Sequence, residues 1–273
     1  MLNIAIKAAR RAGDIINQAS RNLDILNISK KSRSDFVSEV DSAAEEAIIR
    51  ILHDTYPGHA ILAEESGIRG SENNTEYQWI IDPLDGTTNF LHGLPQYSVS
   101  IALKYKGQLN KAVVYNPNNN ELFSASRGGG AYLNNQRIRV SKRTRLEDCL
   151  IGTGIPFRDL THFEAYLKMF KDIIPHVAGI RRPGSAALDL SYVAAGRYDG
   201  FWEIGLAPWD MAAGCLIIQE AGGLVSDLEG NDTFLKSGQI LAGSPKVFVQ
   251  LLQIIQPHLS EALIENHRAA QKH

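Results

Sequence analysis

The chain has 273 residues, of which 44% are hydrophobic and 21% are charged, and its formal net charge is -2. This length and apolar content are sufficient for a large buried core, in one domain or in two closely packed halves. A nearly neutral chain has no global attraction to nucleic acid or to an anionic membrane. Two cysteines do not form a disulfide framework, and the sequence has neither a signal-like N-terminus nor an apolar run of about 20 residues, so we expect a cytoplasmic protein.

Two helices followed by several strands are predicted in the first half. Apolar residues recur at helical spacing over 2–19, and a second helix is expected to begin at an N-cap formed by Asp41 or Ser42, with Ser42 and Glu45 as a capping box. Pro83 is expected to end a central strand, because proline cannot donate to the ladder. The strands predicted in this half are 60–64, 77–82, 97–105, 111–115 and 121–125.

Strands and helices alternate in the second half. The predicted strands are 150–154, 198–204, 224–227 and 239–242. The predicted helices are 163–174, 185–195, 208–221 and 246–255. Elements that alternate in blocks favour layers of helix and sheet over a bundle or a barrel. We therefore expect one domain over 1–273, with approximate halves at 1–145 and 146–273.

The most informative segment is 82–87, with the sequence DPLDGT, where an apolar strand runs into a turn. Asp82 and Asp85 place two carboxylates at the strand end, and Gly86 permits a tight turn before Thr87 begins a helical turn. Carboxylates bind a hard cation such as Mg²⁺, and the N–H groups at a helix start bind phosphate. Taken alone, the segment also fits an ordinary Asp-Gly turn with threonine caps.

Further acidic residues fit the same chemistry. Glu64 and Glu65 follow a predicted strand, and adjacent carboxylates that repel each other favour a cation nearby. Asp41 and Asp210 lie at predicted helix starts. Each pair also has a simpler interpretation, because the glutamates fit a solvated strand exit and the aspartates fit helix N-caps.

Taken in order, the segments 63–66 (AEES), 81–90 (IDPLDGTTNF) and 208–214 (PWDMAAG) resemble the motifs of the inositol monophosphatase family. The resemblance covers nearly the whole chain, and 181–190 (RRPGSAALDL) and 201–206 (FWEIGL) are most similar to its bacterial SuhB-type members. It implies the αβαβα sandwich of the inositol monophosphatase and fructose-1,6-bisphosphatase type. It also implies a homodimer, inhibition by Li⁺ and Mg²⁺-dependent hydrolysis of a small sugar-like phosphate monoester, with myo-inositol 1-phosphate as the favoured substrate.

The resemblance implies roles for individual residues. Thr87, oriented by Asp41, would position and help deprotonate the attacking water. Glu64 would assist catalysis through a third ion, and Asp82 would bridge the first two. The implied ligands of two or three Mg²⁺ ions are Glu64, Asp82, the carbonyl of Leu84, Asp85 and Asp210. The implied substrate and phosphate contacts are Lys30, Asp85, Gly86, Thr87, Gly184, Ser185, Ala186, Glu203 and Asp210.

Some of these positions have plainer interpretations. Glu203 also fits a charge-paired scaffold residue, Ser185 a helix cap and Lys30 a solvated loop lysine. The same metal core acts on fructose 1,6-bisphosphate and on adenosine 3′,5′-bisphosphate in related enzymes. The core therefore fixes the reaction class but not which alcohol carries the phosphate of the substrate.

A regulatory role also stays open, because SuhB-type members act in ribosomal RNA transcription with Nus factors and RNA polymerase. The sequence has no RNA-recognition motif and no strongly basic domain, so such a role would use protein contacts, around Arg181 and Arg182.

Overall fold

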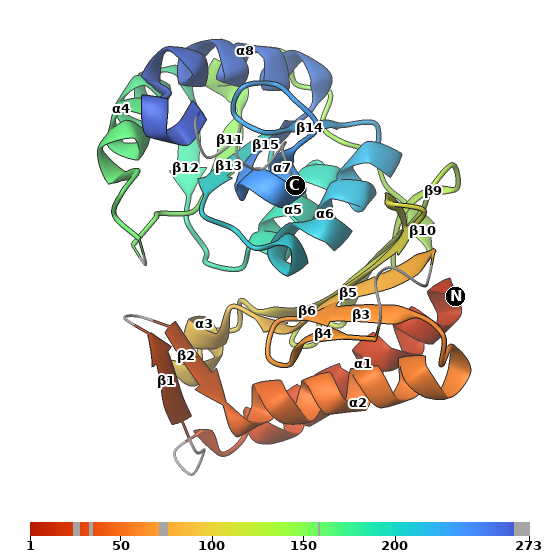
Figure 1. The fold of residues 1–273 in the computed structure, drawn as a ribbon. Coiled ribbons are helices and arrows are strands. Elements are labelled where there is room, and N and C mark those ends of the chain that lie inside the picture. The colour runs from red at the N-terminus through yellow and green to blue at the C-terminus, as the bar shows by residue number, and fades with distance from the viewer. Residues whose placement is uncertain (24–27, 33–34, 71–75, 158, 265–273) are drawn as a thin grey trace.

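Layers of secondary structure stack in the order helix, sheet, helix, sheet, helix (Figure 1). The computed structural model describes residues 1–23, 28–32, 35–70, 76–157 and 159–264, with only the backbone described at 28–32 and 35–38. The layered arrangement that the alternation of strands and helices predicts is therefore confirmed.

Most predicted elements occur within a few residues of their expected bounds. The described helices are α1 (Leu2–Ala19), α2 (Glu39–Thr55), α3 (Thr87–Leu91), α4 (Phe163–Ile173), α5 (Ala186–Ala194), α6 (Pro208–Glu220), α7 (Phe234–Ser237) and α8 (Pro245–Ile255). The described strands are β1 (Ile28–Ser32), β2 (Asp35–Ser38), β3 (Ala60–Ala63), β4 (Gly67–Arg69), β5 (Tyr77–Asp85), β6 (Ser98–Tyr105), β7 (Gln108–Asn116), β8 (Glu121–Ser126), β9 (Gly130–Leu133), β10 (Gln136–Arg137), β11 (Leu150–Thr153), β12 (Gly179–Arg181), β13 (Gly200–Ile204), β14 (Leu224–Ser226) and β15 (Gln239–Gly243). The sequence did not indicate β1, β2, β4, β9, β10 and β12, which are short and carry no clear apolar alternation.

Each half of the chain contributes one large sheet. The first is ordered β10-β9-β8-β7-β6-β5-β3-β4, and it is antiparallel except where β3 pairs with β5. The second is ordered β12-β11-β13-β15-β14 and is mixed, because β11 runs parallel to both of its neighbours. β1 and β2 form a separate hairpin.

Three apolar cores fill the spaces between the layers. α1 and α2 pack on one face of the first sheet, around side chains such as Ile48 and Trp79. α5 and α6 lie between the two sheets, and their core contains Ile80 and Ile240, one from each sheet. α4 and α8 cover the outer face of the second sheet. The middle core therefore joins the two halves of the chain.

β5 does not end at Asp82 as predicted. It continues through Pro83 to Asp85, and its pairing with β6 shifts between these two aspartates. Their partners on β6 are Ser100 and Ser98, so three steps along β5 match two steps along β6, which is a β-bulge. The proline is tolerated because a bulge takes its position out of the regular ladder.

The second helix begins earlier than its sequence signals suggest. We expected Asp41 or Ser42 to be the N-cap and Glu45 to complete a capping box, but α2 begins at Glu39. The Glu45 carboxylate instead accepts hydrogen bonds from the backbone of residues 65–66. The capping prediction was wrong because both Asp41 and Glu45 are buried and have tertiary partners, which outweigh local capping.

The close approach of α5 and α6 predicts that Gly214→Ala destabilises the fold. A Cβ at Gly214 would lie 2.5 Å from Cβ of Leu190, which cannot move without its backbone. Overpacking costs about 1–3 kcal/mol, which exceeds the helix-propensity gain of about 1 kcal/mol. We expect a lower melting temperature in calorimetry. Gly58→Ala, at an exposed glycine with no atom within 4 Å of the added Cβ, is the control. Equal stability of the two variants would contradict the packing argument.

Candidate active site

The bulge in β5 brings two aspartates onto one face of the sheet. Residues three apart in a regular strand point to opposite faces. Here Asp82 and Asp85 pair with Ser100 and Ser98, which are two residues apart and share a face. The Ser100 hydroxyl donates to the carbonyl oxygen of Trp209 at 3.1 Å, so this face is the one toward α6.

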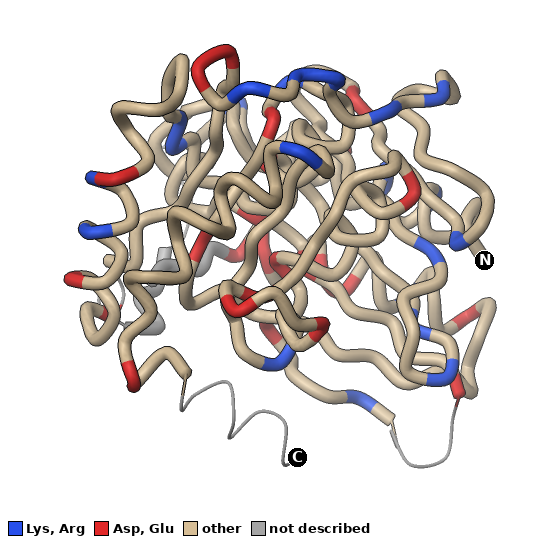
Figure 2. The backbone as a smooth tube through the Cα atoms, turned by 90° about the horizontal axis from the view of Figure 1, so that it is seen from above, with Lys and Arg blue, Asp and Glu red and all other residues tan. Residues whose placement is uncertain are grey.

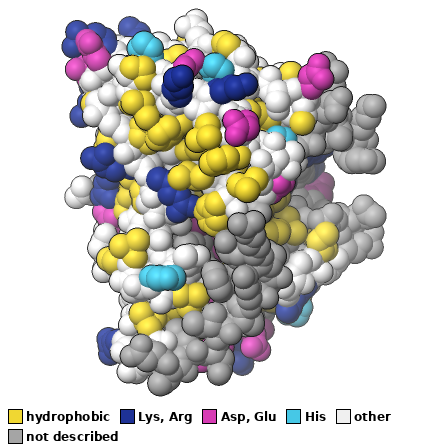
Figure 3. All heavy atoms as spheres, turned by 90° about the vertical axis from the view of Figure 1, so that its left-hand side faces the viewer, with side chains coloured by type: hydrophobic (Ala, Val, Ile, Leu, Met, Phe, Trp, Pro, Cys, Tyr) yellow, Lys and Arg dark blue, Asp and Glu magenta, His cyan; other side chains and the backbone are white. Residues whose placement is uncertain are grey.

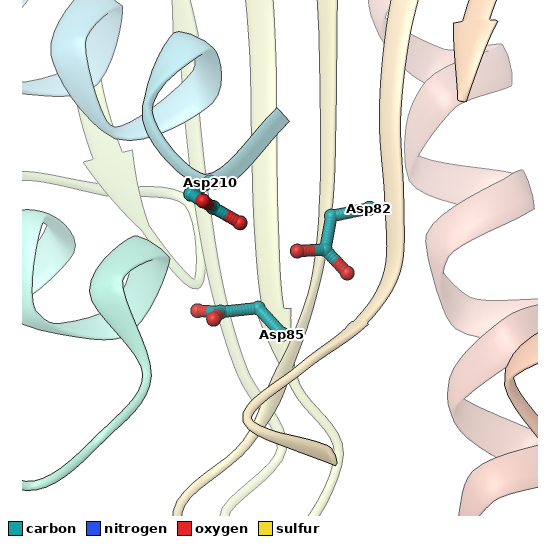
Figure 4. A group of neighbouring side chains, drawn as sticks. All are labelled: Asp82, Asp85 and Asp210. Atoms are coloured by element: carbon teal, nitrogen blue, oxygen red, sulfur yellow. The ribbon is translucent and has the colours of Figure 1, made fainter. Parts of the chain in front are cut away.

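The first turn of α6 supplies a third carboxylate. Asp210 is the third residue of the helix, and its Oδ2 accepts a hydrogen bond from the N–H of Ala207 at 2.7 Å. Asp82, Asp85 and Asp210 each offer one oxygen, and these oxygens lie within 4.8 Å of one another around a common space (Figure 4). Residues that are distant in the sequence and predicted as metal ligands are thus neighbours in the fold.

Burial and mutual repulsion make this carboxylate cluster costly to ionise. Burial, followed by the negative charges of its acidic neighbours, raises the pKa of Asp82 well above its ordinary value. Burial and the charge of Asp210 raise the pKa of Asp85 to about 7, although hydrogen bonds from the start of α5 act in the opposite direction. Figure 2 shows acidic positions near the centre of the molecule, whereas most Lys and Arg positions lie toward its periphery. A bound cation would offset this repulsion.

Glu64 reaches the cluster from the neighbouring strand. It directly follows β3, and its N–H donates to the carbonyl oxygen of Ile81 at 3.1 Å, which fixes it beside β5. After burial, the charge of Glu64 and a side-chain hydrogen bond between the two carboxyl groups contribute to the raised pKa of Asp82. The carbonyl oxygen of Leu84, another predicted ligand, lies 3.1 Å from the hydroxyl oxygen of Thr87.

Thr87 begins α3 beside the cluster, and its side chain contacts helix α2. Its hydroxyl lies 3.0 Å from Oδ1 of Asp41, which is fully buried on α2. Gly86 precedes it with φ at 93°, and a Cβ there would lie 2.9 Å from the carbonyl oxygen of Gln96, so this turn requires glycine. The first N–H groups of a helix have no partner within the helix and suit an anion.

The start of α5 supports Asp85 from the other side. The Ser185 hydroxyl donates to Oδ2 of Asp85 at 2.6 Å, and the N–H of Ala187 donates to the same oxygen at 2.8 Å. Ser185 is fully buried, whereas Gly184 and Ala186 line the cavity beside the cluster. In this structure Ser185 holds a predicted metal ligand, and the substrate contacts of Gly184 and Ala186 stay predictions.

Glu203, on β13, lines the same cavity, and its carboxylate packs over Gly154. A Cβ at Gly154 would lie only 1.7 Å from Oε1 of Glu203, so the glycine provides the space that this carboxylate occupies. Asp189 lines the cavity too, and burial, followed by the charge of Glu203, raises its pKa well above its ordinary value. Sequence reasoning missed Gly154 and Asp189, because a glycine after a strand and an acid inside an apolar helix match no short motif.

Residues from both halves of the chain thus surround one cavity of about 440 Å³. Glu64, Asp82, Asp85, Thr87 and Asp210 line it next to Glu203. The side chain of Lys30 lies outside the described residues, so its contact with phosphate stays a prediction.

Comparisons with known proteins identify the family of the chain. Residues 1–268 match the model of the inositol monophosphatase family. The chain belongs to the inositol monophosphatase family. Family membership supports a phosphatase activity. Within the described residues, no helix has the length and apolar character that crossing a bilayer requires.

Individual relatives confirm the similarity to SuhB-type members. A Nus factor SuhB from Pseudomonas aeruginosa is 56% identical over 266 residues, which cover 96% of this chain and 98% of the relative. The structure of the extragenic suppressor protein SuhB from Bartonella henselae has a TM-score of 0.90 at 45% identity and covers 93% of this chain and 97% of its own. The inositol monophosphatase from Anabaena has a TM-score of 0.80 at 35% identity, covering 94% of this chain and 95% of its own.

The donor set fits a hard divalent cation. The three clustered aspartates offer only carboxylate oxygens, which Mg²⁺ and Ca²⁺ prefer, and no histidine or cysteine belongs to this cluster among the described residues. Two of the aspartates are buried and repel each other, so the site gains most from an ion of high charge.

The raised pKa values predict how Mg²⁺ stabilisation depends on pH. Asp82 and Asp85 bind protons more tightly in the folded chain than in the unfolded one, so the cation-free fold loses stability as pH rises from the ordinary carboxyl pKa through the raised values, about 7 for Asp85. Mg²⁺ needs the ionised carboxylates, so the melting temperature should rise more on adding Mg²⁺ at about pH 8 than at about pH 5.5. A free Mg²⁺ concentration of 100 times the Kd raises the free energy of unfolding by about 2.7 kcal/mol. NaCl of equal ionic strength is the control, and a shift independent of pH would contradict this assignment.

Proposed function

We propose that this chain is a Mg²⁺-dependent phosphatase that hydrolyses a small sugar-like phosphate monoester, with myo-inositol 1-phosphate as the favoured substrate. The observation that carries the proposal is the convergence of Asp82, Asp85 and Asp210 to within 4.8 Å, in one cavity with Thr87. The proposal includes two or three ions, held by these aspartates, Glu64 and the carbonyl oxygen of Leu84, and inhibition by Li⁺.

Each group in the cavity has a task in this reaction. Mg²⁺, when bound, lowers the pKa of a coordinated water and offsets negative charge on the phosphoryl group. The Thr87 hydroxyl, held by Asp41, orients the attacking water and accepts its proton as the hydroxyl passes its own proton to Asp41. Backbone N–H groups of Gly86 and Thr87 bind phosphate oxygens as charge develops on them. The cluster needs no serine or cysteine nucleophile, so water attacks directly.

The cavity wall supports a polyhydroxy alcohol as the leaving group. Glu203 presents a carboxylate there, which accepts hydrogen bonds from hydroxyl groups, and Arg182 and Asp189 add further polar groups. A related structure carries the name inositol monophosphatase, which favours an inositol ring. Fructose 1,6-bisphosphate and adenosine 3′,5′-bisphosphate remain the alternatives that a substrate panel with Mg²⁺ would separate.

A regulatory role is a second candidate, supported by the name Nus factor SuhB of a relative that is 56% identical. Figure 3 shows hydrophobic side chains gathered on the face that carries α4. The exposed apolar residues on α4, in the loop before it and just after it are Ile155, Phe157, Leu160, Leu167 and Ile174. The guanidinium of Arg182 lies 5.1 Å from the centre of the Phe157 ring. Arg181 and Arg182, the pair around which the sequence predicts protein contacts, therefore border this apolar surface. Such a surface suits a protein partner.

Two partners are proposed for this chain, a second copy in a homodimer and the Nus factors with RNA polymerase. Light scattering after size-exclusion chromatography reports the first, and a monomer at all concentrations would exclude it. A pull-down with purified Nus factors and RNA polymerase tests the second partner. If an Asp82→Asn chain captures these proteins as well as the wild type does, the regulatory role is independent of catalysis. The expected cytoplasmic location is checked by cell fractionation.

Loss of the central ligand should abolish hydrolysis. Asp82→Asn keeps the size of the side chain but removes the negative charge of the proposed bridging ligand, so phosphate release from myo-inositol 1-phosphate should fall at least about 100- to 1000-fold, the scale of a lost electrostatic group. Wild-type release should require Mg²⁺ and should decline as LiCl is titrated. Asp14→Asn, at an exposed position on α1, is the control. Full activity of Asp82→Asn in excess Mg²⁺ would overturn the proposal.

The packing of Glu203 on Gly154 predicts a change of specificity in Gly154→Ala. The added methyl group displaces the carboxylate, and a lost hydrogen bond to a charged group of about 1.5–3 kcal/mol corresponds to about a 10- to 150-fold loss. We expect this loss in kcat/KM for myo-inositol 1-phosphate and little change for p-nitrophenyl phosphate, which has no ring hydroxyl groups. Glu203→Gln should show the same pattern. An equal loss on both substrates would mean that the variant disturbs the phosphate site instead.

A further inference from the structure

Helix α2 carries two buried carboxylates on one face. Asp41 and Glu45 are four residues apart, so they lie one turn apart on the same side of the helix. Both are buried, with 0% and 3% of their surface exposed. Asp41 holds Thr87, whereas Glu45 neither lines the cavity nor belongs to the implied set of ligands. A buried carboxylate needs strong partners, because its desolvation is costly.

Both oxygens of Glu45 are used by one backbone turn. Oε2 accepts a hydrogen bond from the N–H of Glu65 at 2.8 Å, and Oε1 accepts one from the N–H of Ser66 at 3.0 Å. Hydrogen bonds to an ionised acceptor are about twice as strong as neutral ones, and a low-dielectric surrounding strengthens them further. The turn between β3 and β4 is therefore attached to α2 by a two-point contact.

This turn begins with Glu64. On one side, the N–H of Glu64 donates to Ile81 on β5 at 3.1 Å. On the other side, the next two N–H groups along the chain donate to Glu45. The backbone that carries the Glu64 carboxyl is thus fixed from both sides, next to Asp82. Asp41 accepts a hydrogen bond from Thr87, just after β5, and Glu45 accepts one from the turn just after β3. The two acids of α2 therefore hold the two segments that carry the site.

We propose that Glu45 is a positioning residue that holds Glu64 against the carboxylate cluster and so sets the affinity of the site for its cation. This inference rests on the proposed function, because it assumes that the cluster binds Mg²⁺. Glu45 does not touch the cation or the substrate. Groups that orient metal ligands in this way typically change metal affinity about 10- to 100-fold when they are replaced.

The test compares Glu45→Gln with Glu46→Gln. Glutamine keeps the size of the side chain but offers one acceptor oxygen and places an N–H group against a backbone donor. Glu46 is exposed on the same helix and controls for the loss of one charge. Calorimetric titration of Mg²⁺ into the metal-free chains should show a Kd raised at least about 10-fold in Glu45→Gln and little changed in Glu46→Gln. Phosphate release should recover at saturating Mg²⁺, with kcat near that of the wild type.

A double-mutant cycle separates positioning from a general effect on the fold. If Glu45 acts through Glu64, Glu45→Gln should weaken Mg²⁺ binding no further in a Glu64→Gln background. A lower melting temperature with unchanged Mg²⁺ affinity, or additive losses in the cycle, would overturn the proposal. If Glu45→Gln does not fold, Glu45→Asp is measured in the same way, and failure of both to fold would assign Glu45 to fold stability instead.

The controls also distinguish this inference from the proposed function. If the wild-type chain binds no Mg²⁺ and releases no phosphate, the phosphatase assignment fails. If it does both and Glu45→Gln binds Mg²⁺ as tightly as the wild type, only the positioning role fails.

Discussion

The repulsion among buried carboxylates is the constraint on which this structure depends. Asp82 is 1% exposed, and its burial, followed by the charges of Glu64, Asp85 and Asp210 beside it, raises its pKa. A fold does not gather such groups for stability, because each ionised neighbour makes the next harder to ionise. The arrangement becomes favourable when a cation occupies the space among them, which links the stability of the fold to its chemistry.

The site is assembled by elements that the layered fold brings together. β5 supplies two aspartates on one face only because a bulge inserts one residue between them. α6 supplies Asp210 from the layer between the sheets, and α5 in the same layer holds Asp85 through Ser185 and Ala187. α2, on the opposite face of the sheet, fixes Thr87 and the turn after Glu64. The cluster therefore lies where three layers meet.

Much of this arrangement could be predicted from the sequence. Apolar periodicity located most helices and strands, and the DPLDGT segment identified the acidic strand end, because these signals are local. Three-dimensional details were not accessible in this way. Pro83 reads as a strand terminator, yet the bulge accommodates it. Glu45 reads as part of a capping box, yet its partners lie 20 and 21 residues further along the chain. Ser185 reads as a substrate contact or cap, yet it supports a carboxylate 100 residues away.

The most direct test of the central claim is a crystal structure of the chain soaked in Mn²⁺, with anomalous diffraction measured to locate the ion. Mn²⁺ shares the preference of Mg²⁺ for carboxylate oxygens. The account predicts an anomalous peak in contact with oxygens of Asp82, Asp85 and Asp210. A map with no peak among these three side chains at saturating Mn²⁺, while they keep their present positions, would contradict it.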